Sequence, residues 1–459
     1  MNKKMMIIFF ILSVSAVFGE SILEKYVEEG LSRNLSLLSA EYCLKESIAR
    51  VNEARGKFFP TISVEARTSW NWGGRTMSLP VGDIVNPLYS IHGIPPIPSN
   101  YDIPMLPGDD QELKIRVMQP VFVSSLYYNA AIQELMKNSA EFQRAVTARF
   151  LTAEIKKAYF TCMKAAQIRI VLENAGKVLD ENLRVTEVLF KNGVVTEDAV
   201  YRARAEKAGI QQKITEAGNG DALSVAYFNF LLQRQHDTPV KFVSAGEYCR
   251  PLEVSLQEAV GCALSFREEL LMLVRGKSIQ DQLQGLHTGS YLPSVFIAVD
   301  GGLFADGFQF SINDYFLSFS IVARWEAFDG FQAASRAEQA GLAASRMNIN
   351  FSEMKDKIRL EVQEAYSRCI VSQKTIESAR EELSGIEKYF SLVEKKYQEG
   401  LSSQLEYFEA QSRLTRASIN VASAEYDYCI NFALLESVSC ISKKDMLTIG
   451  SISQGDEQK

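Results

Sequence analysis

Two glutamates, Glu406 and Glu409, stand three positions apart in the stretch KKYQEGLSSQLEYFEAQ at residues 395–411. Side chains at positions i and i+3 of a helix share one face, so the two carboxylates would lie together and could attract cations. Taken alone, such a pair is more typical of a solvated helix face. The stretch has a near-echo, VLFKNGVVTEDAVYRAR at residues 188–204, with a glycine and a preceding aromatic residue in matching places.

The sequence contains none of the residue sets that support catalysis or metal binding. Its three histidines, His92, His236 and His287, are far apart in the chain and predict no zinc site. No H-E-x-x-H, G-x-S-x-G or G-x-G-x-x-G motif occurs, and the GKS at residues 276–278 lacks the earlier glycine of a phosphate-binding loop. We therefore predict neither an enzyme nor a bound cofactor. The net charge of −7, with no run of basic residues, argues against nucleic acid as a partner.

The cysteines form no C-x-x-C pair, and we expect most of them to be small buried apolar residues on helices. An odd number in an exported chain cannot all pair internally, but one disulfide, for example within the Cys249 and Cys262 region, stays open. The seven positions are Cys43, Cys162, Cys249, Cys262, Cys369, Cys429 and Cys440.

The first residues have the composition of an export signal. Lys3 and Lys4 precede an apolar run from Met5 to Phe18, and Gly19 follows. The run is shorter than the ~20 residues that a bilayer-spanning helix needs. A buried N-terminal helix is the alternative, but the basic start, apolar middle and small residues together favour cleavage after Gly19.

Proline placement predicts very long helices. All twelve prolines lie at or before position 293, and residues 121–238 and 294–459 contain none. A proline inside a helix costs ~3 kcal/mol, so gaps of this length suit long helices. The first helix, from about Ser124 to Asn192, would be about 69 residues or ~100 Å long. The 3-4 spacing of a coiled-coil seam is present in Leu383, Ile386, Phe390, Val393 and Tyr397, and more weakly in Leu179, Leu183, Thr186 and Phe190.

Four other segments alternate between apolar and polar residues. Alternation over about ten residues predicts strands with one apolar and one wet face, and tilted strands of that length can span a membrane. All three tryptophans, Trp70, Trp72 and Trp325, fall in these segments, as expected of aromatic residues at a membrane interface. A soluble β-layer packed on helices is the alternative. The four segments are residues 60–74, 112–122, 293–304 and 315–328.

The two halves of the chain repeat one another. A shift of 233 positions carries Leu23 onto Leu256 and Pro60 onto Pro293, and a shift of 207 carries Gly193 onto Gly400. The difference is extra sequence in the first half, where a stretch with seven prolines predicts a loop. We expect a signal peptide at 1–19 and a polar tail at 441–459. The first repeat would have helices at 20–58, a strand pair at 59–122 with a loop at 74–111, and long helices at 123–250 that turn near 193. The second repeat would have helices at 251–292, a strand pair at 293–328, and long helices at 329–440 that turn near 400.

This arrangement resembles the TolC-like outer-membrane efflux protein family. The resemblance covers about residues 20–440 and is carried by GLSRNLSLLSAEYCLKESIARVNEARGKFFPTISV, by MQPVF answered by ARWEAFDGF, and by the turn motifs FKNGVVTEDA and KYQEGLSSQLEYFEAQ. It implies an α+β homotrimer with two tandem repeats per chain. Four transmembrane strands per chain would close a twelve-stranded barrel in the outer membrane of a diderm bacterium, continued by a long α-helical coiled-coil barrel in the periplasm. Closure agrees with physics, because a closed barrel leaves no unpaired strand edge in lipid.

The resemblance also implies a function and partners. The protein would be a passive, gated channel of a tripartite efflux or type I secretion system, exporting small toxic compounds or proteins to the exterior. Besides outer-membrane lipid, its partners would be a periplasmic adaptor (membrane fusion) protein and an inner-membrane pump driven by protons or ATP. The alternative is a periplasmic coiled-coil scaffold without a pore.

The family's functional residues fall at the two turns. Glu406 and Glu409 match its acidic pore constriction, and Tyr397 matches its tip aromatic, so a trimer would bring two carboxylates from each chain to the axis. Family members often have Asp at these positions, and Ser402 replaces a basic partner found in some of them, which favours a looser constriction. The tip that meets the adaptor would consist of Gly193, Val194, Val195 and Thr196 with Gly400, Leu401, Ser402 and Ser403, where glycine permits the positive φ of a chain reversal.

Overall fold

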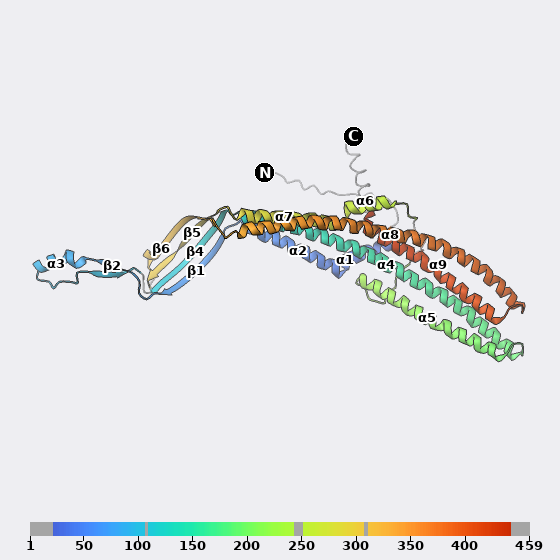
Figure 1. Ribbon diagram of the computed structural model, residues 1–459. Coiled ribbons are helices and arrows are strands. Elements are labelled where there is room, and N and C mark those ends of the chain that lie inside the picture. Colours follow the sequence, from blue (N-terminus) through green and yellow to red (C-terminus); the bar gives the residue numbers. More distant parts are fainter. Residues whose placement is uncertain (1–21, 106–108, 243–250, 307–310, 442–459) are drawn as a thin grey trace, which may run out of the picture. The chain divides into compact units, whose positions relative to one another are not determined.

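The computed structural model describes residues 22–105, 109–242, 251–306 and 311–441 (Figure 1). The predicted signal peptide, Cys249 and nearly all of the predicted tail lie outside these ranges. The chain forms two compact units. We call one the helical unit, which is built from the described parts of Met1–Lys45, Ser139–Val274 and Met347–Lys459. The other, the sheet unit, is built from Glu46–Asn138 and Arg275–Arg346.

The sheet unit contains a four-stranded antiparallel sheet in the order β1-β4-β5-β6, which confirms the four predicted strands (Figure 1). Each half of the chain contributes one strand pair, and the β4–β5 pairing, with Val117 opposite Val299, joins the halves. Strands β1 and β6 are the edges of the sheet. The strands are β1 (Thr61–Trp70), β4 (Asp109–Phe122), β5 (Ser294–Asp306) and β6 (Tyr315–Arg324).

The prediction that residues 74–111 form only a loop is wrong, because this proline-rich stretch also contains regular secondary structure. It contains a two-stranded sheet, β2 (Thr76–Leu79) with β3 (Tyr101–Pro104), and a helix, α3 (Val81–Ile91). Pro80 immediately precedes α3, where a missing N–H costs no intrahelical bond. Composition missed these elements because contacts between residues distant in the stretch hold them together.

The helices confirm both the long hairpins and the repeat. Helix α4 is 68 residues long and α8 is 67. Moved by 233 positions, α2 falls on α7, and moved by 207, the end of α4 and the start of α5 fall on those of α8 and α9. No described helix is long and apolar enough to cross a bilayer. The helices are α1 (Ile22–Arg33), α2 (Leu35–Gly56), α4 (Ser124–Lys191), α5 (Glu197–Leu231), α6 (Leu256–Phe266), α7 (Glu268–Gly289), α8 (Gln332–Gln398) and α9 (Gln404–Ser439).

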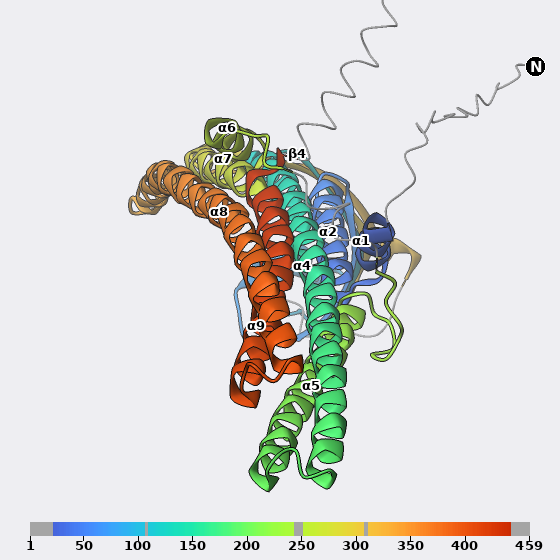
Figure 2. The same ribbon diagram turned by 90° about the vertical axis from the view of Figure 1, so that its right-hand side faces the viewer.

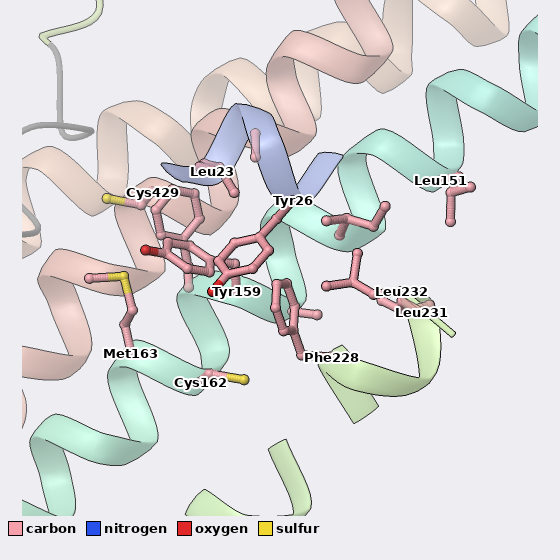
Figure 3. Close-up of a cluster of buried hydrophobic side chains, with 14 of the residues drawn as sticks. Leu23, Tyr26, Leu151, Tyr159, Cys162, Met163, Phe228, Leu231, Leu232 and Cys429 are labelled. Atoms are coloured by element: carbon pink, nitrogen blue, oxygen red, sulfur yellow. The ribbon is translucent and has the colours of Figure 1, made fainter. Parts of the chain in front are cut away.

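An aromatic cluster packs α1 against α4 and α5 in the helical unit (Figure 3). The ring of Tyr26 lies edge-on to Phe228, with centroids 5.2 Å apart, and Tyr159 is fully buried beside both. Gly30 allows the close approach, since a Cβ there would lie 2.3 Å from the Cδ1 atom of Ile155. The second half of the chain builds another buried cluster, mainly aliphatic, from α6, α7, α8 and α9, and it includes the fully buried Ile358.

The cysteines largely follow the expectation of small buried side chains. Among the described residues, Cys162, Cys262 and Cys369 are free and buried, Cys440 is also buried, and Cys43 is free and exposed. Burial raises the pKa of the Cys162 and Cys369 thiols to about 11. Cys262 is free, so it forms no disulfide with Cys249, and Cys429 is disulfide-bonded.

Candidate functional site

The turn between α8 and α9 is a chain reversal made possible by one glycine. Gly400 has a φ of +73°, and its N–H donates to the carbonyl of Tyr397 at 3.1 Å. The N–H of Leu401 donates to the carbonyl of Lys396 at 2.7 Å. These two bonds satisfy the last carbonyls of α8 in the manner of a Schellman motif. The prediction of a positive φ at this glycine is confirmed.

The turn between α4 and α5 repeats this geometry. Gly193 has a φ of +70°, its N–H donates to Phe190 at 2.9 Å, and the N–H of Val194 donates to Leu189 at 2.9 Å. A Cβ at either glycine would meet no atom within 4 Å, so backbone conformation and not space requires glycine. At each turn the next residue is apolar and exposed: Val194 is 68% exposed and Leu401 74%.

The residues after the two glycines differ between the halves. Ser403 caps α9, since its Oγ accepts the N–H of Glu406 at 3.2 Å, and the hydroxyl of Ser402 donates to Oε2 of Glu406 at 2.6 Å. Thr196 instead donates its hydroxyl to Asp198 and makes no side-chain cap for α5. A hydroxyl group therefore holds a carboxylate at both turns, but of the two returning helices only α9 has a side-chain cap.

The two candidate constriction glutamates lie on the same helix in different surroundings. Glu406 is half-buried and held by Ser402, whereas Glu409 is exposed. Tyr397 stacks on Tyr407, with ring centroids 4.8 Å apart and an interplanar angle of 23°. Tyr407 is buried, and burial raises the pKa of its hydroxyl to about 12. The sequence reasoning missed Tyr407, although its place in EYFEA, next to Glu406, was a signal for an inward-facing aromatic.

The two long hairpins, α4–α5 and α8–α9, lie side by side (Figure 2), and a shared core of buried side chains holds them together near the turns. Buried Val393 and Phe408 of the second hairpin pack in one cluster with Leu179 and Ala203 of the first. In this region Gln404 Nε2 donates to the hydroxyl of buried Thr186 at 3.3 Å. The strong predicted seam of α8 faces inward, but Phe190, the last residue of the weaker seam of α4, is exposed.

The four-stranded sheet has one charged and one apolar face. On the charged face Arg116 donates twice to Asp300, at 2.7 and 2.9 Å, and Lys114 lies 3.2 Å from Glu65 and 2.9 Å from Glu112. This network of ion pairs links β1, β4 and β5, and the sequence reasoning did not predict it. The other face is apolar and uncovered within the described chain, with Ile62, Val64, Leu317, Phe319 and Ile321 all about two-thirds exposed or more.

The three tryptophans are exposed at opposite ends of this sheet. Trp70 ends β1, and Trp72 follows it. Trp325 follows β6 at the other end, because its neighbour Arg324 pairs with Ser294, the first residue of β5. The indole N–H of Trp325 donates to the carbonyl of Tyr291 at 3.0 Å. Two separated aromatic levels are typical of a strand unit that crosses a bilayer.

A buried charge cluster ties four helices of the helical unit. Arg149 of α4 donates to Glu268 at 3.2 Å and to Glu269 at 2.6 Å, and also to a backbone carbonyl of α9. Arg267 donates to Glu269 at 2.7 Å and to Glu361 of α8. Burial would raise the pKa of the Glu269 carboxyl, but the two arginines outweigh it and lower that pKa to about 2. Within the described ranges, no three His, Cys, Asp or Glu side chains converge as metal ligands.

Comparisons with known proteins agree with this geometry. Residues 305–439 match the family model described as outer membrane efflux protein. Among curated proteins, none matches the sequence. The chain is similar in structure to the Campylobacter jejuni CmeC outer membrane channel, with a TM-score of 0.72 and 13% identity over 91% of this chain and 85% of that one. It is also similar to the outer membrane protein VceC from Vibrio cholerae, with a TM-score of 0.69 and 14% identity over 91% and 96%. The open Neisseria gonorrhoeae MtrE outer membrane channel gives a TM-score of 0.72 and 14% identity over 91% and 88%. The chain thus has the fold of the TolC-like outer-membrane channels and contains an outer membrane efflux protein domain over residues 305–439.

Proposed function

We propose that this protein is the outer-membrane channel of a tripartite exporter, a passive and gated conduit from the periplasmic side to the exterior. The observation that supports it most is the sheet, which has an uncovered apolar face, a charged face and two open edges. An apolar face of this kind needs lipid or protein against it, and open edges are not tolerated in lipid. The ion pairs of Arg116 and Lys114 would then line a watery lumen.

Three copies of the chain together would leave no strand edge unpaired. The strands alternate in direction, so β6 of one chain can pair antiparallel with β1 of the next. Four strands from each of three chains would give a twelve-stranded barrel, large enough for an aqueous interior. The homotrimer would be embedded in outer-membrane lipid, with its long helices in the periplasm.

The two turns would be the periplasmic tip. Val194 and Leu401 are exposed apolar residues at equivalent places in the repeat, next to Gly193 and Gly400. Small exposed apolar residues on rigid turns suit docking by another protein, and we assign them to a periplasmic adaptor. The adaptor would connect the channel to an inner-membrane pump, which supplies the energy of transport.

The pore constriction would be formed by Glu406 and Glu409, with Tyr397 behind them. The bond from Ser402 fixes Glu406, and the stack on Tyr407 fixes Tyr397, so both side chains are preorganised near the turn. A ring of carboxylates at the axis would attract cations and disfavour anions. The exposed Glu409 would be the more mobile member of the pair.

The channel is tested by extraction and conductance of the full chain. Detergent should be required to release the protein from outer membranes, a native gel should show a trimer, and planar bilayers containing it should conduct. Release by osmotic shock without detergent, as a protein that never conducts, would support a periplasmic scaffold instead and would overturn the proposal.

A further inference from the structure

Helix α3, within the stretch between β1 and β4, carries an uncovered apolar stripe. Ile84, Pro87, Leu88 and Ile91 follow the i, i+3, i+4, i+7 pattern of one helix face, and all four are exposed. Ile84 is 71% exposed, Leu88 59% and Ile91 75%. Four apolar residues in this pattern are typical of a helix face that packs against a partner.

The stripe cannot turn inward, because the opposite face of α3 is fastened to its own stretch. The side-chain amide of Asn86 donates to the carbonyl of Ile97 and accepts the N–H of Ile97, both at 2.9 Å. The N–H of Gly82 donates to the carbonyl of Ser99 at 3.0 Å. A Cβ at Gly82 would lie 2.3 Å from the carbonyl oxygen of Pro98, so the helix lies tightly on this segment. Strand β2, which precedes α3, pairs with β3, which follows this segment, so the pairing closes the stretch into a hairpin. Helix α3 lies at the far end of that hairpin (Figure 1).

The charge of α3 argues against a membrane surface as the occupant of the stripe. Helices that lie on anionic lipid are rich in Lys and Arg on their polar face. The one charged residue of α3 is Asp83, and it flanks the stripe. An acidic helix without basic residues gains nothing from anionic headgroups.

The connection of α3 to the sheet points to a second copy. The stretch leaves from β1, which is an edge strand and would lie against the next chain in the proposed barrel. We propose that the stripe of α3 packs on the α3 stripes of the other two chains, so that three helices form a cap over the outer mouth of the channel. This inference rests on the proposed trimer. Around a threefold axis equivalent residues meet only where they lie at the axis itself. In this cap the stripes converge on the axis over the mouth, so Leu88 would lie close to Leu88 of each neighbour.

Cross-linking of single cysteines in the full chain tests the cap. Leu88→Cys places a thiol in the stripe, and the matched control, Ser90→Cys, places one on the same helix outside it. Both are made in a Cys43→Ser background, because Cys43 is the exposed free thiol among the described cysteines. With a short bismaleimide, Leu88→Cys should convert most of the monomer band on a denaturing gel into dimer, and Ser90→Cys should not. Neither side chain belongs to a buried cluster, so neither change should disturb folding.

The outcomes separate the cap from the channel itself. If native gels show a trimer but Leu88→Cys gives no more dimer than Ser90→Cys, the cap is wrong and the channel stands. If no trimer forms at all, the channel fails and the cap with it. A fluorophore attached to the thiol of the Leu88→Cys variant should also escape quenching by a headgroup spin-labelled lipid in phosphatidylglycerol-containing vesicles. Strong quenching would mean that the stripe lies on lipid, and would overturn the cap.

Discussion

Replacing Gly400 by alanine should loosen the end of α8 and nothing else. Gly400 has a φ of +73°, and no atom lies within 4 Å of the place a Cβ would take. The cost therefore comes from the left-handed backbone alone, about 1–2 kcal/mol. The N–H groups of positions 400 and 401 are held by Tyr397 and Lys396. Local opening should expose them about 5 to 30 times more often, which hydrogen–deuterium exchange of peptides spanning the turn will measure.

Gly385→Ala is the matched control, because it makes the same chemical change but should have the opposite effect on amide exchange. Gly385 lies inside α8, has ordinary helical backbone and also has open space around it. Alanine favours a helix interior over glycine by about 1 kcal/mol, so exchange of neighbouring amides should slow. The reasoning is refuted if Gly400→Ala leaves exchange at the turn unchanged or slows it, because the turn would then not require a left-handed residue.

Three further changes test the charges. Arg149→Leu removes one of the two arginines of the buried cluster and should destabilise the protein by about 3–5 kcal/mol. Arg368→Leu breaks an exposed pair and should cost under about 1 kcal/mol. Similar melting temperatures of the two variants would contradict the cluster. The folded pKa of Glu269 is lowered from 4.5 to about 2, so its stabilisation is complete above pH 4.5 and is lost as pH falls toward 2. Glu269→Gln should flatten the pH dependence of thermal stability in that window, and an unchanged profile would rule out this role. Replacing Glu406 and Glu409 by alanine should weaken block of conductance by divalent cations, and parental block would exclude the carboxylate ring.

The elements that could be predicted from sequence are those with local signals. The strands follow from alternation, as in Leu317, Phe319 and Ile321, and the long helices from the absence of proline. The reversals at Gly193 and Gly400 follow from a requirement of the backbone itself. The repeat then indicated which elements of the two halves correspond, because these elements begin and end at matching positions.

Features that depend on which side chains meet were not predictable in this way. Helix α3 lies in a proline-rich stretch that has the composition of a loop, and it is held by the contact of Asn86 with Ile97. The bond from Ser402 to Glu406 and the stack of Tyr397 on Tyr407 need the folded turn before they can be seen. The ion pair of Arg116 with Asp300 joins residues from different halves of the chain. The pore and adaptor roles of the turn residues stay predictions.

The central claim, closure of three sheets into one barrel, is tested most directly at the sheet edges. Val64→Cys in β1 is combined, one at a time, with a cysteine replacing Leu317, Phe319, Ile321 or Ala323 in β6. Several positions in β6 are used because the register between β6 of one chain and β1 of the next is not known in advance. At one or two of these positions, oxidation should give covalent dimers and trimers on a denaturing gel, because β6 of each chain pairs with β1 of the next. A folded chain that stays monomeric, with no cross-link at any position along β6, would contradict the channel.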